Sequence, residues 1–284
     1  MTGDARVHRP DSLEETTALL RDLDDAMVYG GGTAIQILRK QGLLFTEDYV
    51  DIARVPGLTD VVVTDDTVRI GALTPLRRVE TDTRVRQLIP LASETYGHVA
   101  NPRVRNTASA GGNIAHGDYR LDPPTALAVL DATVELTSST GVRHVSIREF
   151  FTDFQETAIE HGELITAISV PAQPARARGA FAKMRALSRN DWPSASAAVL
   201  AVPDDGFIEI RIGLGAVAPT TVYLAFDLTA DMDEQQAVDA AIDIANSAMD
   251  PIPDVRGSAA YKAQLGRVAV EEAVRRCLKE FARD

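Results

Sequence analysis

Two clusters of glycine and other small residues are the features of this sequence whose types and spacing best suit chemistry. The first, Tyr29-Gly30-Gly31-Gly32-Thr33-Ala34, stands between an apolar run that predicts a strand and a stretch that predicts a helix. Glycine permits positive φ and close approach of the backbone, and the first N–H groups of a helix attract phosphate. The spacing fits neither a G-x-G-x-x-G motif nor a lysine-containing phosphate loop. A simple tight turn is the alternative interpretation.

The second cluster, Asn106-Thr107-Ala108-Ser109-Ala110-Gly111-Gly112-Asn113-Ile114, lies in a segment, 101–122, that predicts a long loop. Long irregular segments inside a compact domain are usually functional. Backbone N–H groups together with the Ser109 and Asn113 side chains could hold a diphosphate. If so, Gly111→Asp should expel the ligand by placing a negative side chain against it. Asp122 begins the next expected helix, where it could contact the ligand or cap the helix.

The elements expected around these clusters indicate two parts. The N-terminal part alternates helices and strands, and Ser12 with Glu15 forms a capping box at its first helix. Its expected helices are 12–24, one from residue 33, most of 75–100 and 123–130; its strands are 26–29, 48–52, 60–64, 67–72, 134–137, 142–147 and 164–170. Residues 172–178 read as a linker. Strands at 180–187, 195–202 and 207–217 and helices at 233–249 and 258–282 then predict an α+β C-terminal part.

Composition excludes several functional classes. The 29 basic and 41 acidic residues give a net charge of −12, which argues against nucleic acid or an anionic membrane as the main partner. A single cysteine, Cys277, excludes a disulfide framework and a four-cysteine metal or iron–sulfur site, and no histidine pair has metal-ligand spacing. No apolar run reaches the ~18 residues of a transmembrane helix, and no signal peptide pattern is present. We therefore expect a soluble cytoplasmic protein.

Taken together, the two clusters resemble a specific family. The strand–GGGT–helix pattern, then R-x-x-x-S-A-G-G-N and D-P-P-x-x-L-x-x-L-D-A, is similar to the FAD-binding (medium) subunit of the molybdenum hydroxylases, which include carbon monoxide and xanthine dehydrogenases. Residues 162–168 and Phe181-Ala182-Lys183 extend the resemblance over nearly the whole chain. It implies an α+β fold: a two-part α/β FAD-binding domain of the PCMH type over 1–175 (subdomains about 1–57 and 58–175), then a smaller α+β domain over 176–284 like the C-terminal domain of the CO dehydrogenase flavoprotein.

The resemblance also implies residue roles. Residues 29–35 and 109–113 match the two loops at the FAD diphosphate, Asp122 an acidic cofactor contact, and Ile165 a hydrophobic residue beside the adenine or flavin end. Lys183 matches a lysine near the isoalloxazine and Trp192 an aromatic residue there, although the spacing from Lys183 to Asp191 is one residue longer than in some relatives. Without the resemblance, Lys183 reads as a solvated lysine and Trp192 as a core residue. The implied cofactor-binding residues are Tyr29, Gly30, Gly31, Gly32, Thr33, Ala34, Ile35, Ser109, Ala110, Gly111, Gly112, Asn113, Asp122, Ile165, Lys183 and Trp192.

The function implied by the resemblance is that of an oxidoreductase subunit whose chemistry belongs to the flavin, so no catalytic acid, base or nucleophile is expected. The first loop contains no histidine or cysteine, so we expect non-covalent FAD. Molybdenum-pterin and [2Fe–2S] clusters are expected only in a large and a small partner subunit, in a dimer of heterotrimers. Electrons would pass from the [2Fe–2S] subunit to this chain and on to quinone, NAD or oxygen. The alternatives are a stand-alone FAD-dependent oxidase or dehydrogenase of the same broad fold, and an assembly subunit without cofactor.

Overall fold

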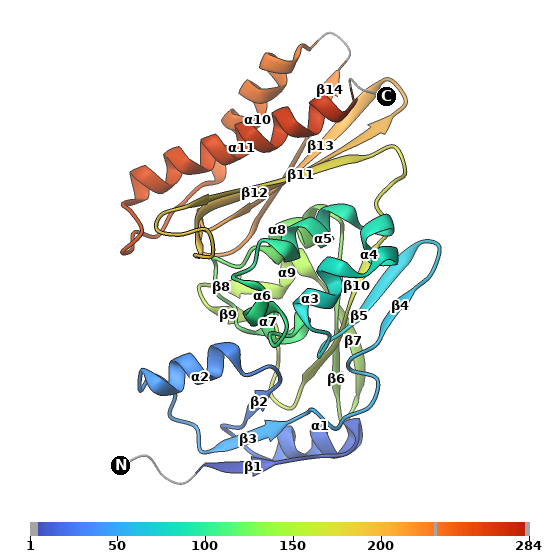
Figure 1. The fold of residues 1–284 in the computed structure, drawn as a ribbon, viewed down its shortest axis with the longest axis vertical. Coiled ribbons are helices and arrows are strands. Elements are labelled where there is room, and N and C mark those ends of the chain that lie inside the picture. The colour runs from blue at the N-terminus through green and yellow to red at the C-terminus, as the bar shows by residue number, and fades with distance from the viewer. Residues whose placement is uncertain (1–4, 230–231, 282–284) are drawn as a thin grey trace.

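The computed structural model describes residues 5–229 and 232–281, which are arranged as three stacked parts (Figure 1). The N-terminal part contains a parallel sheet in the order β1-β3-β2. Ser12 begins its first helix by accepting a hydrogen bond from the Glu15 N–H, while the Glu15 carboxylate accepts one from the Asp11 N–H. The elements of this part are β1 (Arg6–His8), α1 (Leu13–Asp22), β2 (Met27–Tyr29), α2 (Thr33–Lys40) and β3 (Asp48–Asp51).

The middle part contains an antiparallel sheet in the order β4-β5-β10-β6-β7, covered on one face by short helices. Val134 and Leu136 of β6 point into the core while their neighbours do not, as the period of two in a strand requires. Its elements are β4 (Val61–Val63), β5 (Thr67–Gly71), α3 (Leu76–Thr81), α4 (Thr83–Leu88), α5 (Pro90–Gly97), α6 (Pro102–Arg105), α7 (Ala110–Ala115), α8 (Pro123–Val129), β6 (Thr133–Ser138), β7 (Gly141–Ser146), α9 (Ile147–Phe150), β8 (Phe151–Asp153), β9 (Glu156–Thr157) and β10 (Leu164–Pro171).

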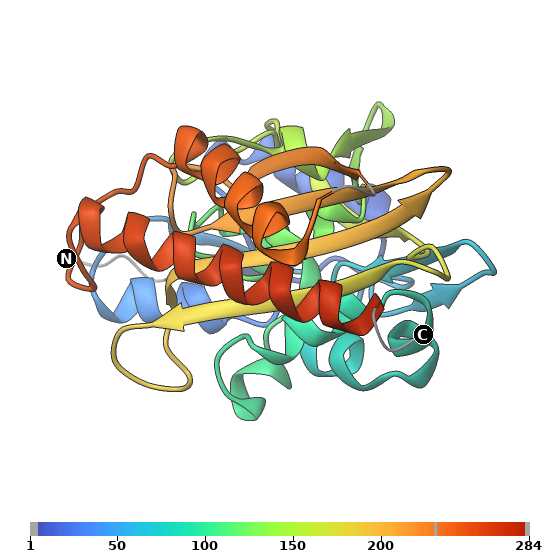
Figure 2. The same cartoon turned by 90° about the horizontal axis from the view of Figure 1, so that it is seen from above.

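The C-terminal part is a four-stranded antiparallel sheet with two helices on one face (Figure 2). Alternate residues of its strands face opposite ways: Ala197 packs toward the helices, whereas Phe181 and Leu200 join the core of the middle part. The sheet face that carries Phe181 and Leu200 therefore joins the C-terminal part to the middle part. The elements are β11 (Arg178–Arg185), β12 (Pro193–Asp204), β13 (Phe207–Gly215), β14 (Val222–Thr229), α10 (Glu234–Ala248) and α11 (Ala259–Phe281). Among the described residues, no helix has the length and apolar character needed to cross a membrane.

Several elements differ from those expected. The segment 101–122 was predicted as a loop, but it contains α6 and α7, because Asn101 and Ser109 cap these helices with their side chains. The expected helical segment 75–100 contains three helices, because α3 follows Pro75, Asp82 caps α4 and α5 begins at Pro90. Strands β1, β8, β9 and β14 and helix α9 were not predicted, and β14 is formed by its pairing with β13. Residue 282, the expected end of the last helix, lies outside the described residues.

Candidate functional site

The two glycine clusters are in direct contact. The chain turns from β2 into α2 through Gly30–Gly32, and a Cβ atom at Gly31 would lie 1.9 Å from the Thr107 carbonyl oxygen. A Cβ atom at Gly30 would lie 3.2 Å from the Ser109 hydroxyl oxygen. A side chain at Gly31 would collide with backbone, so a residue without Cβ is required for the clusters to approach this closely. Two segments almost eighty residues apart therefore form one site.

The first cluster presents a row of unused donors. Gly32 has φ of 68°, and a Cβ there would lie 2.2 Å from the Tyr29 hydroxyl, which accepts a hydrogen bond from Gln36. No side chain caps α2, and within the described chain the backbone N–H groups of residues 31–35 have no acceptor. First-turn N–H groups have no intrahelical partner, so they point toward any ligand beyond the helix. This geometry suits an anion.

The second cluster is built differently from the expectation. Ser109 caps α7 by accepting from the Gly112 N–H at 3.3 Å, and the N–H groups of Ala110 and Gly111 donate to the carbonyls of Thr74 and Ala72. Some of the backbone N–H groups predicted to bind a ligand are therefore already hydrogen-bonded within the protein. A Cβ at Gly111 would lie 2.6 Å from the Ala72 Cβ. The reasoning behind Gly111→Asp was wrong, because its side chain would enter the packed sheet.

Two groups of this cluster remain open to a ligand. Gly112 is exposed. The Oδ1 atom of Asn113 is buried without a hydrogen-bond partner among the described residues. Because an unpaired buried polar atom is costly, the Asn113 side chain points to a ligand that would satisfy it.

Helix α7 connects the glycine contact to Trp192. Ser109, at its start, lies beside Gly30, and His116, which follows its last residue, has its ring 6.3 Å from the Trp192 ring. The Arg120 guanidinium lies 5.2 Å from the same ring. Trp192 is partly exposed in the loop between β11 and β12, so its interpretation as a core residue was wrong. At about 1.5 Å per residue, the six residues of α7 give the site an elongated shape.

Asp122 and Lys183 form a buried ion pair. Lys183 Nζ lies 2.5 Å from Asp122 Oδ2, with side chains only 1% and 4% exposed, and also donates to the His98 carbonyl. Asp122 Oδ1 has no partner among the described residues. Burial raises the pKa of Asp122 to about 6 and lowers the pKa of Lys183, while each charge opposes the shift of the other. Asp122 is the N-cap residue of α8, as one interpretation expected, but its side chain makes no capping hydrogen bond. The interpretation of Lys183 as a solvated lysine was wrong.

Ile165, the remaining predicted residue, and Arg105, which precedes the second cluster, are both buried and help to support the fold around the site. Ile165 lies in β10, buried in the middle core. Arg105 is buried and bonds to Glu80 at 2.8 Å and to the Val99 carbonyl, so it positions the segment before α7. Thr107 belongs to the second cluster, and His98 flanks it, whereas Arg120 was not predicted as part of the site. Thr107 and His98 contribute through backbone carbonyls, for which a sequence has no signal.

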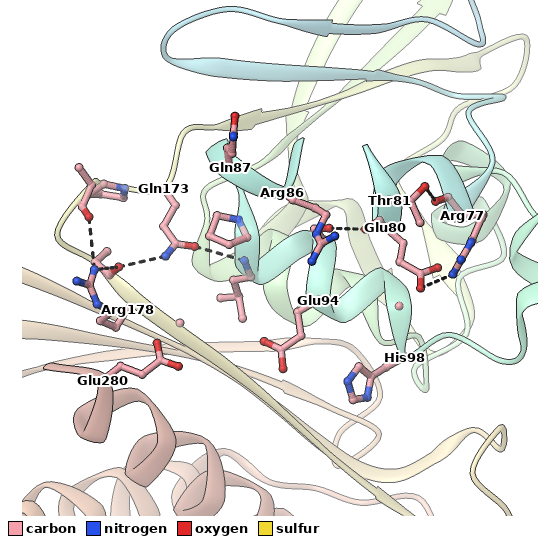
Figure 3. A pocket seen from close by; sticks show the side chains of 18 residues that line it. Arg77, Glu80, Thr81, Arg86, Gln87, Glu94, His98, Gln173, Arg178 and Glu280 are labelled. Atoms are coloured by element: carbon pink, nitrogen blue, oxygen red, sulfur yellow. Dashed lines mark hydrogen bonds and ion pairs between the residues drawn. The ribbon is translucent and has the colours of Figure 1, made fainter. Parts of the chain in front are cut away.

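A groove separate from the glycine clusters is shown in Figure 3. It has a volume of about 830 Å³ and lies between α3, α5, the segment 173–179 and the end of α11. Its charges are largely paired within the chain: Arg77 with Glu80 at 2.6 Å, and Glu94 with Arg276 at 2.8 Å. None of the predicted cofactor-binding residues lines it. We therefore place the functional site at the glycine clusters.

Family models cover both the N-terminal and the C-terminal portions of the chain. Residues 3–173 match a family model described as the FAD binding domain in molybdopterin dehydrogenase, and residues 179–277 match the CO dehydrogenase flavoprotein C-terminal domain. The chain belongs to the FAD-binding medium-subunit family of the molybdenum hydroxylases. The resemblance seen in the sequence, the α+β fold, the presence of an FAD-binding domain and the assignment to oxidoreductase subunits are confirmed.

Relatives in this medium-subunit family match over nearly the whole chain. The 6-hydroxypseudooxynicotine dehydrogenase complex subunit alpha of Paenarthrobacter nicotinovorans is 31% identical, over 94% of this chain and 92% of its own length. The carbon monoxide dehydrogenase medium chain of Afipia carboxidovorans is 31% identical, over 96% of both chains. A chain from a crystal structure of Cu,Mo-CO dehydrogenase in its cyanide-inactivated form superposes with a TM-score of 0.91 at 31% identity, covering 98% of each chain.

Proposed function

We propose that this chain is the electron-transfer subunit of a molybdenum hydroxylase complex and holds one FAD non-covalently along α7. The chain receives electrons from a small [2Fe–2S] subunit and delivers them to quinone, NAD or oxygen. The molybdenum-pterin and the clusters belong to partner subunits, and the complex is a dimer of heterotrimers. The contact of the glycine clusters beside the unpaired N–H groups of residues 31–35 carries this proposal.

The residues of the first cluster fit the diphosphate. A diphosphate has about two negative charges, and a row of fixed N–H dipoles can stabilise them although residues 29–34 include no lysine or arginine. This matters in a protein of net charge −12. The absence of side chains at Gly30, Gly31 and Gly32 lets oxygen atoms approach the backbone. Asn113, with its orphaned buried oxygen, offers a further polar contact from the second cluster.

The far end of α7 fits the flavin ring. When bound, FAD supplies the isoalloxazine that accepts and releases electrons. Trp192 is exposed enough to stack on an aromatic ring. Lys183 is almost entirely covered, so it acts on the ring through its charge rather than by broad contact. Asp122 holds that lysine in place.

The proposed FAD-binding set keeps all sixteen residues expected from the sequence, with altered roles for some. Ala110 and Gly111 support the site by tying α7 to the middle sheet, and Ile165 supports it from the core. We also propose the division into domains 1–175, with subdomains about 1–57 and 58–175, and 176–284. The set is Tyr29, Gly30, Gly31, Gly32, Thr33, Ala34, Ile35, Ser109, Ala110, Gly111, Gly112, Asn113, Asp122, Ile165, Lys183 and Trp192.

Purification of the full chain with its coexpressed partners tests the proposal. We expect one FAD per chain, released by acid into the supernatant, and reduction of the flavin by substrate only when the partner subunits are present. A panel of quinone, NAD and oxygen then identifies the acceptor. Reduction of the isolated chain by an organic substrate would indicate a stand-alone dehydrogenase. A complex without flavin would indicate an assembly subunit, and either result refutes the proposal.

A further inference from the structure

The loop that carries Trp192 is anchored at Asp191. Residues 186–192 connect β11 to β12, and in Figure 2 this yellow loop projects beyond the C-terminal sheet. Asp191 is the most buried residue of the loop, with a side chain only 12% exposed. Its Oδ1 atom accepts a hydrogen bond from the Trp192 backbone N–H at 2.8 Å. A group that fixes the Asp191 carboxylate therefore also fixes the backbone of Trp192.

Arg256 fixes that carboxylate from a segment 65 residues further along the chain. Its Nη2 atom donates to Asp191 Oδ1 at 3.1 Å, and its side chain is only 14% exposed. Burial alone would raise the pKa of Asp191, but the hydrogen bonds from Arg256 and from the Trp192 N–H lower it. Asp191 is therefore ionised at neutral pH, and the hydrogen bond between the two charged groups is stronger than a neutral one.

Asp254 holds Arg256 in turn. Its Oδ1 atom accepts from the Arg256 backbone N–H at 2.8 Å and lies 3.0 Å from Lys262 Nζ. The Lys262 side chain is completely buried and also donates to the Ile252 carbonyl at 2.8 Å. A buried ammonium group needs such partners, so Lys262 keeps Asp254 and the segment 252–256 in one conformation.

Asp254 also contacts the groups beside the Trp192 ring. Its Oδ2 atom accepts from the Tyr119 hydroxyl at 3.1 Å and lies 3.8 Å from Arg120 Nη1. The Arg120 guanidinium lies 5.2 Å from the centre of the Trp192 ring, within the ~6 Å at which a cation attracts an indole. One carboxylate therefore connects the residue that fixes the Trp192 backbone with the residue that faces its ring.

We propose that Arg256 is a positioning residue of the FAD site and, through Asp191, holds the Trp192 indole in the orientation that meets the flavin ring. This inference rests on the proposed function. Without that contact the loop, which is exposed apart from Asp191, would let the indole sample several orientations, and FAD binding would have to order it. With the contact, the orientation is set when the protein folds. Arg256 itself lies outside the proposed FAD-binding set.

The chain contains a single tryptophan, so its fluorescence reports on Trp192 alone. In Arg256→Ala, measured on the full chain after removal of FAD, we expect a larger fast component in the anisotropy decay and stronger quenching by acrylamide. FAD should bind about 2- to 12-fold more weakly, as expected when one more side chain must be ordered on binding. Arg256→Lys should recover most of the affinity, because it keeps a positive charge beside Asp191.

Asp191→Asn tests the route through the carboxylate. It keeps an acceptor for the Trp192 N–H but removes the charge that Arg256 contacts, so it should reproduce the effects of Arg256→Ala. The double variant should be little worse than either single variant, because both remove the same interaction. Asn and Asp are nearly equal in size, so Asp191→Asn provides the same comparison if Arg256→Ala does not fold.

Arg275→Ala is the matched control, because Arg275 also forms an ion pair in the C-terminal part, with Glu234 at 2.8 Å, outside the contacts around Trp192. It should leave the anisotropy decay and the FAD affinity unchanged. A wild-type anisotropy decay in Arg256→Ala, with only a lower melting temperature, overturns the inference, as do additive effects of Arg256→Ala and Asp191→Asn. The proposed function fails separately: a wild-type chain that binds no FAD refutes it, whereas the anisotropy comparison needs no FAD.

Discussion

Substitution of Gly31 by alanine tests the central contact of the site. The added methyl group would lie 1.9 Å from the Thr107 carbonyl oxygen and 2.8 Å from its carbon, whereas non-bonded atoms are stable at about 3.5 Å. Both neighbours belong to the backbone, so no side chain can rotate away. The two clusters must separate by roughly 1.5 Å. Overpacking of this kind costs about 1–3 kcal/mol.

We expect that separation to weaken FAD binding by about 5- to 150-fold, the equivalent of that free energy. The dissociation constant of FAD can be measured by flavin fluorescence on full-length protein from which FAD has been removed, together with its unfolding free energy. Gly97→Ala is the control, because its methyl group would meet only the Glu80 side chain at 3.3 Å. Unchanged FAD affinity and stability in Gly31→Ala would refute the close contact between the clusters.

Three further predictions concern the surrounding structure. Gly111→Ala should destabilise the protein even without FAD, because its methyl group would lie 2.6 Å from Ala72 Cβ; equal denaturation midpoints for variant and wild type would contradict this packing. Lys183→Met should cost about 3–5 kcal/mol of unfolding free energy by leaving Asp122 buried without its partner, and Asp122→Asn in the same chain should recover part of the loss; a double-mutant cycle with additive losses would argue against the ion pair. Burial and nearby cations lower the pKa of His98 to about 4 in the folded protein. Because the unfolded chain takes up this proton at a higher pH, the free energy of unfolding should decrease as the pH is lowered from about 6.5 to about 4. His98→Asn should flatten that part of the pH–stability profile, and an unchanged slope in acid-denaturation experiments would exclude the histidine as its source.

The strongest sequence patterns predicted the elements around the site correctly. The alternation and turn residues around Asp65-Asp66 and Asp204-Asp205-Gly206 predicted two hairpins, and the capping box at Ser12 predicted the start of α1. Such local signals survive because neighbouring residues satisfy their own hydrogen bonds. The prediction of a loop over 101–122 was wrong because the helices of this segment are short. Asn101 and Ser109 cap these helices, but the same residue types also favour turns, so the sequence pattern was interpreted as a loop.

The sequence alone determined that small residues at 30–32 and 109–112 could bring a backbone close to a ligand, since that property belongs to glycine itself. It also determined the absence of any cysteine-based cluster. Only the tertiary structure decided which backbone N–H groups are available to a ligand. Those of Ala110 and Gly111 donate to carbonyls distant in the chain, whereas those of residues 31–35 have no acceptor among the described residues. The tertiary structure also buries Lys183 against Asp122. Hydrogen-bond partners and burial depend on segments distant in the chain, so no local pattern encodes them.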